Sequence, residues 1–277
     1  MSRSAGVAPR ALPSRLVKAG APGEVEGFPG LRVIRADNPS PLTLDGTRTH
    51  IVGRERCVVV DPGPADAAHL DRLVDALEQA SSVAIALTHD HPDHAEGAPG
   101  LADRLAARGL AAQVHGVALG TLEEADTLDA DAGRLVAIAT PGHTRDHVAF
   151  YWPGAGAVFC GDLMTGGMDT ALVASPEGDL GDYLDSLNRI GALRPGAIFP
   201  AHGPPFTTSP EGAIATYLEH RRARLEQVRA ALAEGLTESD ALVTRVYGEA
   251  LPAALRPAAA AALDAYRDHI GAGRGDR

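Results

Sequence analysis

The stretch VAIALTHDHPDH, residues 83–94, decides the fold, because an aliphatic run leads directly into three histidines and two aspartates. The run VAIAL at 83–87 has no polar face, which is typical of a strand covered on both sides. His89 and His91 are two residues apart, so they point the same way while the chain stays extended. Functional side chains usually lie in such a loop at the end of a buried strand. The stretch therefore predicts a functional loop at the edge of a sheet.

Imidazole and carboxylate groups at this density suit a borderline divalent metal, because an unpaired cluster of them would cost stability. Three further motifs, each at a predicted strand end, add histidine or aspartate: TPGH at 140–143, GD at 161–162 and AHG at 201–203. The resulting seven candidate ligands are His89, His91, Asp93, His94, His143, Asp162 and His202. A single tetrahedral ion needs only about four ligands, so the count favours two ions that share a bridging residue.

Outward from this loop, short β-rich runs alternate with helical patterns, which predicts an α/β protein. The predicted strands cover residues 31–36, 49–53, 57–61, 83–87, 111–115, 135–140, 147–152, 157–162 and 197–202. Helices are predicted over residues 65–80, 94–108, 179–193 and 209–233. We expect a loose lead-in at residues 1–30, a core at 31–208, and a helical C-terminal region at 209–277 made of a long helix and a small cap.

Composition narrows the class of protein further. The chain has 277 residues with 25 Lys and Arg against 36 Asp and Glu, a net charge of −11, so its average surface repels nucleic acid and anionic lipid. No run approaches the ~18 apolar residues of a membrane span, and no continuous apolar segment marks a signal peptide. We therefore expect a cytoplasmic protein that does not enter membranes, with Cys57 and Cys160 as reduced thiols in buried strands.

The motifs resemble the metallo-β-lactamase superfamily, whose signature is HxHxDH followed by Gly-His, Gly-Asp and a final His. The matching segments are HDHPDH (89–94), PGHT (141–144), CGD (160–162) and AHG (201–203). Further segments resemble its lactamase-beta-two-like subgroup, namely NPSPLTLDGTRTHIVG (38–53), TPGHTRDHVAFY (140–151), HGP (202–204) and YLEHR (217–221). The resemblance implies an αββα sandwich with the site at one edge and a C-terminal helical cap.

The resemblance also implies a role for each candidate ligand. It assigns one ion to His89, His91 and His143, and the other to Asp93, His94 and His202. Asp162 would bridge the ions, and Asp61 in VVVDPG would support the ligand loop without touching a metal. Asp93 and Asp90 are the candidate catalytic residues, with a purely hydrogen-bonding role as the alternative for Asp90. We expect zinc as the metal because it binds such ligands most tightly, and iron and manganese are the alternatives.

These features predict a two-metal hydrolase that uses a metal-bound hydroxide to cleave an ester or thioester of a small metabolite or a carrier-bound acyl group. The resembled subgroup includes acyl-carrier thioesterases and a single-strand-specific endoribonuclease, so RNA cleavage is the alternative. The negative charge and the 4% aromatic content count against RNA, whereas four arginines within residues 221–229 favour it. A lactonase is the weakest alternative, because similar lactonases place a tyrosine where Thr165 stands here. The acyl group and the oligomeric state stay open.

Two residues outside the ligand set have open roles. Arg221 takes the place of an apolar side chain in the buried stripe of the predicted long helix. A buried guanidinium requires a partner, so Arg221 would meet a carboxylate of the core or an anionic group of a substrate. The alternative is that its stem covers the stripe while its head reaches water. His147, four residues past His143, is either part of the site or a strand residue that faces solvent.

Overall fold

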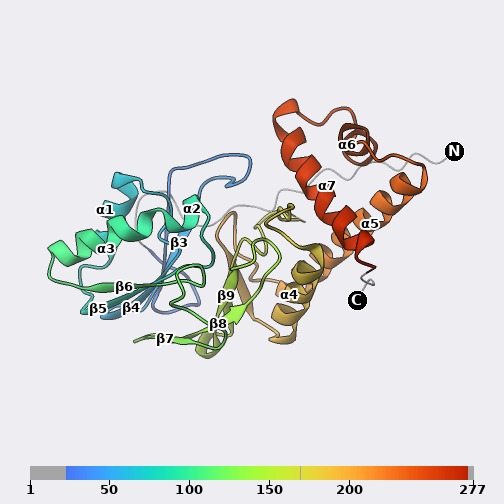
Figure 1. Cartoon of the computed structure of the whole chain (residues 1–277). Coiled ribbons are helices and arrows are strands. Elements are labelled where there is room, and N and C mark those ends of the chain that lie inside the picture. Colours follow the sequence, from blue (N-terminus) through green and yellow to red (C-terminus); the bar gives the residue numbers. More distant parts are fainter. Residues whose placement is uncertain (1–22, 169, 274–277) are drawn as a thin grey trace.

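The computed structural model of the protein describes residues 23–168 and 170–273, so most of the predicted lead-in at 1–30 lies outside the described residues. Two sheets face each other, and helices cover their outer faces (Figure 1). The first sheet has the spatial order β1 (Gly23–Glu24), β2 (Leu31–Arg35), β3 (Arg48–Val52), β4 (Arg56–Val60), β5 (Ser82–Ala86), β6 (Ala112–His115). The second has the order β11 (Ala197–Pro200), β10 (Ala157–Gly161), β9 (Val148–Trp152), β8 (Gly133–Ala139), β7 (Thr127–Ala130).

The helices complete the four layers (Figure 1). Their bounds are α1 (Ala67–Ala76), α2 (Pro92–Ala95), α3 (Gly97–Ala107), α4 (Leu180–Ala192), α5 (Pro210–Ala233), α6 (Ser239–Tyr247) and α7 (Arg256–Gly271), with short 3-10 helices at Pro153–Ala155 and Ala253–Leu255. The first three helices lie over the first sheet, and α4 lies beside the second. The predicted αββα sandwich with C-terminal helices is therefore confirmed.

Side-chain alternation along the strands explains the layering. In β4, Val58 and Val60 point into the cluster between the sheets, whereas Cys57 and Val59 point into the cluster under α1 and α3. Both faces of the strand are buried, as the continuous apolar run predicted. Pairing is parallel along β4, β5 and β6 and between β10 and β11, so the carboxyl ends of these strands meet at one edge.

The C-terminal helices α5, α6 and α7 form a cluster of their own. Leu225 and Val228 of α5 pack with Leu263 and Tyr266 of α7, and Leu180 of α4 joins them. The cluster thus attaches the helices to the sandwich through α4, while most of their length extends away from the sheets (Figure 1). No described helix is both long enough and apolar enough to cross a bilayer.

One predicted element differs from the structure, and two strands were not predicted. The helix predicted over 94–108 is two helices, because the amide of Gly97 donates to the carbonyl of Gly63 at 2.8 Å and leaves the helical ladder. Strand β1 was not predicted because it has two residues, and β7 because its segment TLDA alternates with only two apolar residues on the edge of the sheet.

Candidate metal centre

The candidate ligands come from four strand ends. His89, His91, Asp93 and His94 follow β5 and continue into α2, whose first residue is Pro92. His143 lies in the turn between β8 and β9, Asp162 follows β10, and His202 follows β11. Because β5, β10 and β11 all deliver their carboxyl ends to the same edge, residues up to 113 positions apart in the sequence form three overlapping groups with metal-ligand spacing.

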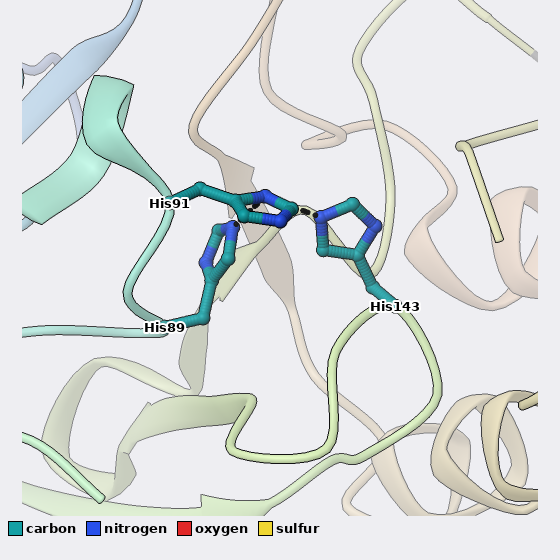
Figure 2. Close-up of side chains that lie close together, drawn as sticks. All are labelled: His89, His91 and His143. Carbon is teal, nitrogen blue, oxygen red and sulfur yellow. Dashed lines mark hydrogen bonds between the residues drawn. The ribbon is translucent and has the colours of Figure 1, made fainter. Parts of the chain in front are cut away.

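The first group consists of His89, His91 and His143, whose rings point toward one another (Figure 2). Nδ1 of His91 lies 2.9 Å from Nε2 of His89 and 3.1 Å from Nε2 of His143. All three inward atoms belong to imidazoles, and a neutral imidazole has one nitrogen that carries a proton and one that carries a lone pair. The other nitrogen of each ring points away from the group, and its hydrogen-bond partner decides which of the two nitrogens carries the proton.

The outward nitrogens all have hydrogen-bond acceptors. Nδ1 of His89 donates to Oγ1 of Thr88 at 3.0 Å, and Nδ1 of His143 donates to the carbonyl of Leu172 at 2.7 Å. Nε2 of His91 donates to Oε2 of Glu177 at 3.3 Å. With their protons outside, the three rings direct lone pairs at one point, which is the donor arrangement that a divalent cation requires.

The second group consists of Asp93, His94 and His202. Oδ2 of Asp93 lies 3.2 Å from Nε2 of His202 and 3.5 Å from Nε2 of His94. Asp162 faces both groups, since its Oδ1 lies 3.2 Å from Nε2 of His202 while its Oδ2 lies 3.7 Å from Nε2 of His143. All seven side chains named from the sequence are therefore gathered at one edge.

The buried polar atoms of this cluster show whether it is suited to a metal ion. Nε2 of His94 and Oδ1 of Asp162 are buried, and neither has a hydrogen-bond partner among the described residues. Buried polar atoms without hydrogen bonds are costly unless another partner, such as a cation, compensates. Burial raises the pKa of Asp162, but His94 and His202 lower it more. The pKa therefore lies well below its usual value, and this carboxylate stays ionised. The donor set and its unsatisfied atoms fit divalent cations.

Asp61 lies directly behind the ligand loop. Its Oδ1 accepts from the amide of Thr88 at 2.8 Å, and its Oδ2 accepts from Oγ1 of Thr88 at 2.8 Å and from Nδ1 of His94 at 2.9 Å. Asp61 is 1% exposed and has a φ of 50°, a conformation that aspartate tolerates better than most residues. It thus has the geometry that the sequence analysis expected of a residue supporting the metal ligands.

Two supporting residues stand outside the predicted set. His147 is buried, so the solvent-facing interpretation is wrong: its Nε2 accepts from the amide of Asp162 at 3.2 Å and its Nδ1 donates to Thr140 at 2.8 Å. Glu177, whose carboxylate accepts the hydrogen bond from Nε2 of His91, belongs to the loop before α4. His147 had a sequence signal in its distance from His143, whereas nothing in the sequence around Glu177 indicated its place.

Two sequence-predicted site residues lie apart from the cluster. Asp90 is exposed and borders a second cavity, of about 190 Å³, that is bordered by His89 but not by Asp93 or Asp162. Arg221 is 4% exposed, so the prediction that its head reaches water is wrong. None of the described carboxylates lies within 4.0 Å of its guanidinium, so the predicted ion pair with the core is not found among the described residues either.

A cleft of about 300 Å³ opens onto the cluster. His91, Asp93, His143, Asp162 and His202 border it from the ligand side. The remaining walls come from α5 and α7, from the segment before β3 and from the segment after β10, the last two through Pro41, Leu42, Leu44, Thr165, Met168, Thr170, Ala171 and Leu172. Its volume lies at the lower end of the range of about 300–1,000 Å³ that is usual for small-molecule sites.

Facing sheets that gather histidines and aspartates at the floor of a cleft define an αββα protein with a candidate metal centre. The chain belongs to the metallo-β-lactamase superfamily, whose sequence pattern matches residues 43–202. Within it, the chain falls into the lactamase-beta-two-like subgroup. The Beta-lactamase-like protein 2 homolog of Drosophila melanogaster is 32% identical over 69% of this chain and 70% of that protein. The homolog of Caenorhabditis elegans is 31% identical over 82% of this chain and 79% of that protein.

Two further similarities extend this comparison. Lactamase-like protein adaB of Aspergillus niger is 30% identical over 72% of this chain, and the aligned part spans 62% of that protein, so the chain matches about three fifths of its length. The solved structure of a beta-lactamase domain protein from Burkholderia ambifaria has a TM-score of 0.81 at 24% identity and covers 94% of this chain and 91% of that one. This likeness shows the fold, including the C-terminal helices.

Proposed function

We propose that this hydrolase binds two divalent cations and cleaves an ester or thioester of a small metabolite or a carrier-bound acyl group. The observation that carries the two-cation proposal is the position of Asp162, whose two oxygens face different groups of ligands. His89, His91 and His143 would hold one cation, and Asp93, His94 and His202 the other, with Asp162 between them. Bound cations supply Lewis acidity toward a carbonyl oxygen and make water acidic enough to yield a nucleophile near neutral pH.

The chain's own residues support hydrolysis without a covalent intermediate. Burial raises the pKa of the Cys160 thiol far above its usual value, and Cys57 is also buried with a raised pKa, so neither is an activated nucleophile. Asp93 has the most exposed carboxylate of the cluster, at 29% against 17% for Asp162. Its Oδ2 faces His202 and His94, which leaves Oδ1 to accept a proton on the side of the cleft.

The walls of the cleft favour an acyl substrate. Leu42 and Met168 border it and are 60% and 42% exposed, so both give the cleft apolar surface. Leu44 and Leu172 continue the apolar lining. An acyl chain would cover these side chains while its carbonyl reaches the ligand cluster. We further propose that residues 209–277 act as a cap, since α5 and α7 contribute to the same cleft.

Zinc is the proposed metal. Five imidazoles and two carboxylates without a thiolate also accept iron or manganese, but zinc binds such ligands more tightly than either divalent ion. Elemental analysis of protein expressed with each metal in turn, followed by activity measurement, tests this choice.

Single-strand-specific RNA cleavage is the alternative, because α5 carries four arginines, two of which border the cleft. Of these, Arg221 is buried and Arg229 pairs with Glu226 at 2.8 Å. RNA binding draws its affinity from several phosphate contacts on an exposed basic surface. Only Arg222 of the four is exposed, so the burial of the others and the net charge of −11 favour a small-molecule substrate.

A substrate panel on metal-analysed protein tests the proposal. It contains p-nitrophenyl butyrate, butyryl-N-acetylcysteamine, a short-chain lactone and labelled single-stranded RNA. We expect hydrolysis of the ester or thioester, lost in His89→Ala and retained in Asp103→Asn, a variant of an exposed aspartate of α3. Cleavage of RNA alone, lost in His89→Ala and suppressed by salt, would establish the alternative instead.

A further inference from the structure

Arg221 of α5 is a buried cation without a described counter-charge. Its Nη1 donates to the hydroxyl of Tyr266 at 3.1 Å, its Nη2 donates to the carbonyl of Ala171, and its Cζ lies 4.7 Å from the ring centroid of Tyr183. Its Nε is buried and has no hydrogen-bond partner among the described residues. Burying a guanidinium without an anion is costly, so the position requires an explanation beyond packing.

Arg224, one turn further along α5, borders the same cleft. Its Nη1 donates to the carbonyl of Val246 at 3.0 Å, and its Cζ lies 4.3 Å from the ring centroid of Tyr247. Neither contact neutralises its charge, and no described carboxylate lies within 4.0 Å of it. Four other arginines of the helical region are paired, namely Arg229 with Glu226, Arg245 with Glu234, Arg256 with Asp240 and Arg267 with Asp264. Arg222 has no ion pair among the described residues, but it is exposed to solvent, whereas Arg221 is buried, Arg224 is half-buried, and both border the cleft.

Tyr266 adds a hydrogen-bond donor beside Arg221. Its hydroxyl accepts the proton of Arg221 Nη1, and within the described part of the chain no acceptor takes its own proton. Tyr266 also borders the cleft. Two guanidiniums and a phenol at one wall of a cleft form a set of donors that matches the oxygens of a carboxylate or phosphate.

The charges of the cleft are divided between its walls. The described carboxylates that border it, Asp93 and Asp162, both belong to the metal-ligand cluster. The wall formed by α5 and α7, called the helical wall below, carries the charges of Arg221 and Arg224. The chain as a whole has a net charge of −11. A surface that is acidic on average therefore has local positive charge where a substrate would lie, which attracts an anion into the cleft.

We propose that the substrate carries an anionic group, a carboxylate or a phosphate, that binds to Arg221, Arg224 and the hydroxyl of Tyr266 while its ester or thioester reaches the ligand cluster. This inference rests on the proposed function for the bond that is cleaved, but anion binding at the helical wall is measurable without it. A carboxylate would lie at the far end of the acyl chain, whereas a phosphate would belong to the leaving group of a phosphopantetheine thioester.

Matched thioesters distinguish the two sources. Succinyl- and butyryl-N-acetylcysteamine differ by a carboxylate in place of a methyl group, and butyryl-phosphopantetheine differs from the neutral butyryl-pantetheine by a phosphate on the leaving group. We expect one anionic substrate to exceed its neutral counterpart in kcat/KM by about tenfold or more, because hydrogen bonds to charged groups are individually strong. A preference for the succinyl compound identifies a carboxylate, and a preference for the phosphopantetheine compound identifies a phosphate.

Variants assign the preference to the helical wall. Arg224→Met, in which a half-buried residue is changed, should reduce kcat/KM for the preferred anionic substrate about tenfold and leave the neutral thioester within about twofold of wild type. Arg221→Lys and Tyr266→Phe should act in the same direction. Arg222→Met is the matched control, because Arg222 is exposed on the same helix and does not border the cleft.

A binding measurement separates this proposal from the proposed function. Succinate and phosphopantetheine, together with the neutral compounds butyramide and pantetheine, are titrated calorimetrically into metal-free wild type, Arg224→Met and Arg222→Met. Binding of one anionic ligand but not of the neutral compounds, lost only in Arg224→Met, supports the anion site even if no thioester is hydrolysed. Equal binding of all ligands, or equal loss of neutral and anionic substrates in Arg224→Met and Arg221→Lys, would overturn it.

Discussion

Nδ1 of His94 lies 2.9 Å from Oδ2 of Asp61, and both side chains are buried. The carboxylate accepts the Nδ1 proton, so Nε2 is the nitrogen of His94 that faces Asp93 and Asp162 and would bind a cation. The other oxygen of Asp61 accepts the amide of Thr88, which immediately precedes the ligand loop. One carboxylate thus fixes the tautomer of a candidate ligand and the backbone that carries it.

The first prediction concerns this contact. Asp61→Asn replaces an ionised acceptor by an amide that can present a donor to His94 or Thr88, so the tautomer of His94 is no longer fixed. We expect the affinity for one of two divalent cations to fall about 10–100-fold, as is typical when a residue behind a metal ligand is changed. Competition titration with a zinc chelator measures it. An unchanged affinity for both ions would show that Asp61 only supports the backbone.

The second prediction is that the purified chain binds about two divalent cations and that Asp162→Ala lowers the affinity for both. The reason is that Oδ1 and Oδ2 of Asp162 face different ligand groups. His202→Ala, which affects the group with Asp93 and His94, should weaken one cation preferentially. Elemental analysis after dialysis against a defined metal concentration measures both variants.

Asp103→Asn is the control for these variants, since Asp103 is exposed on α3 away from the ligands. A stoichiometry that never exceeds one ion in the wild type, even with added zinc, would contradict the two-metal proposal.

The ligand cluster was predictable from the sequence for a local reason. Each motif follows a strand with a strong apolar pattern, and parallel strands deliver their carboxyl ends to one edge whatever the details of packing. Asp61 was predictable in the same way, because it directly follows β4. The two-sheet fold follows from the same apolar runs together with the family resemblance.

Other features depend on packing between distant segments and were not predictable. Glu177 meets His91 across 86 positions of the sequence, in a loop without periodicity. The apolar stripe of α5 correctly indicated that Arg221 is unusual, but its partners are a hydroxyl and a carbonyl brought in by α7 and the loop after β10. Sequence periodicity locates a buried position; it does not identify the groups from other elements that surround it.

The third prediction concerns stability at low pH. His50 of β3 packs against Phe159 and Phe199, and burial, with a smaller effect of Arg48, lowers its pKa from 6.5 to about 3. In the unfolded chain the same imidazole binds a proton below about pH 6.5. Because the folded-state pKa is the lower one, its contribution to stability is present above about pH 6.5 and is lost as the pH falls toward 3.

His50→Leu removes this titration and keeps the position apolar. As the pH falls below 6, we expect the free energy of unfolding to decrease less steeply in the metal-free variant than in metal-free wild type. The two slopes should differ by about 1.4 kcal/mol per pH unit. Ile51→Val, a packing change on the same strand without a titratable group, should keep the wild-type slope. Urea unfolding at several pH values measures the slopes, and parallel curves for His50→Leu and wild type would refute the prediction.

The fourth prediction concerns the contact between α5 and the loop that borders the cleft. The hydroxyl of Tyr217 accepts from the amide of Thr165 at 2.8 Å and donates to the carbonyl of the same residue at 2.7 Å. Thr165 lies between Asp162 and Met168, all of which border the cleft. A single phenol therefore holds the wall of the cleft against the first C-terminal helix.

Tyr217→Phe keeps the ring and removes both hydrogen bonds with Thr165, together with a longer one of 3.5 Å to the carbonyl of Thr170. The Thr165 carbonyl retains the amide of Met168 at 3.3 Å, but its own amide loses its partner, and leaving a buried donor unsatisfied costs about 1–3 kcal/mol. We expect this loss in the free energy of unfolding together with a KM raised several-fold, because the loop that lines the cleft is held less firmly. Tyr151→Phe is the matched control, since no described residue hydrogen-bonds to the Tyr151 hydroxyl. A loss of stability with unchanged KM would show that Tyr217 anchors the helix without shaping the cleft.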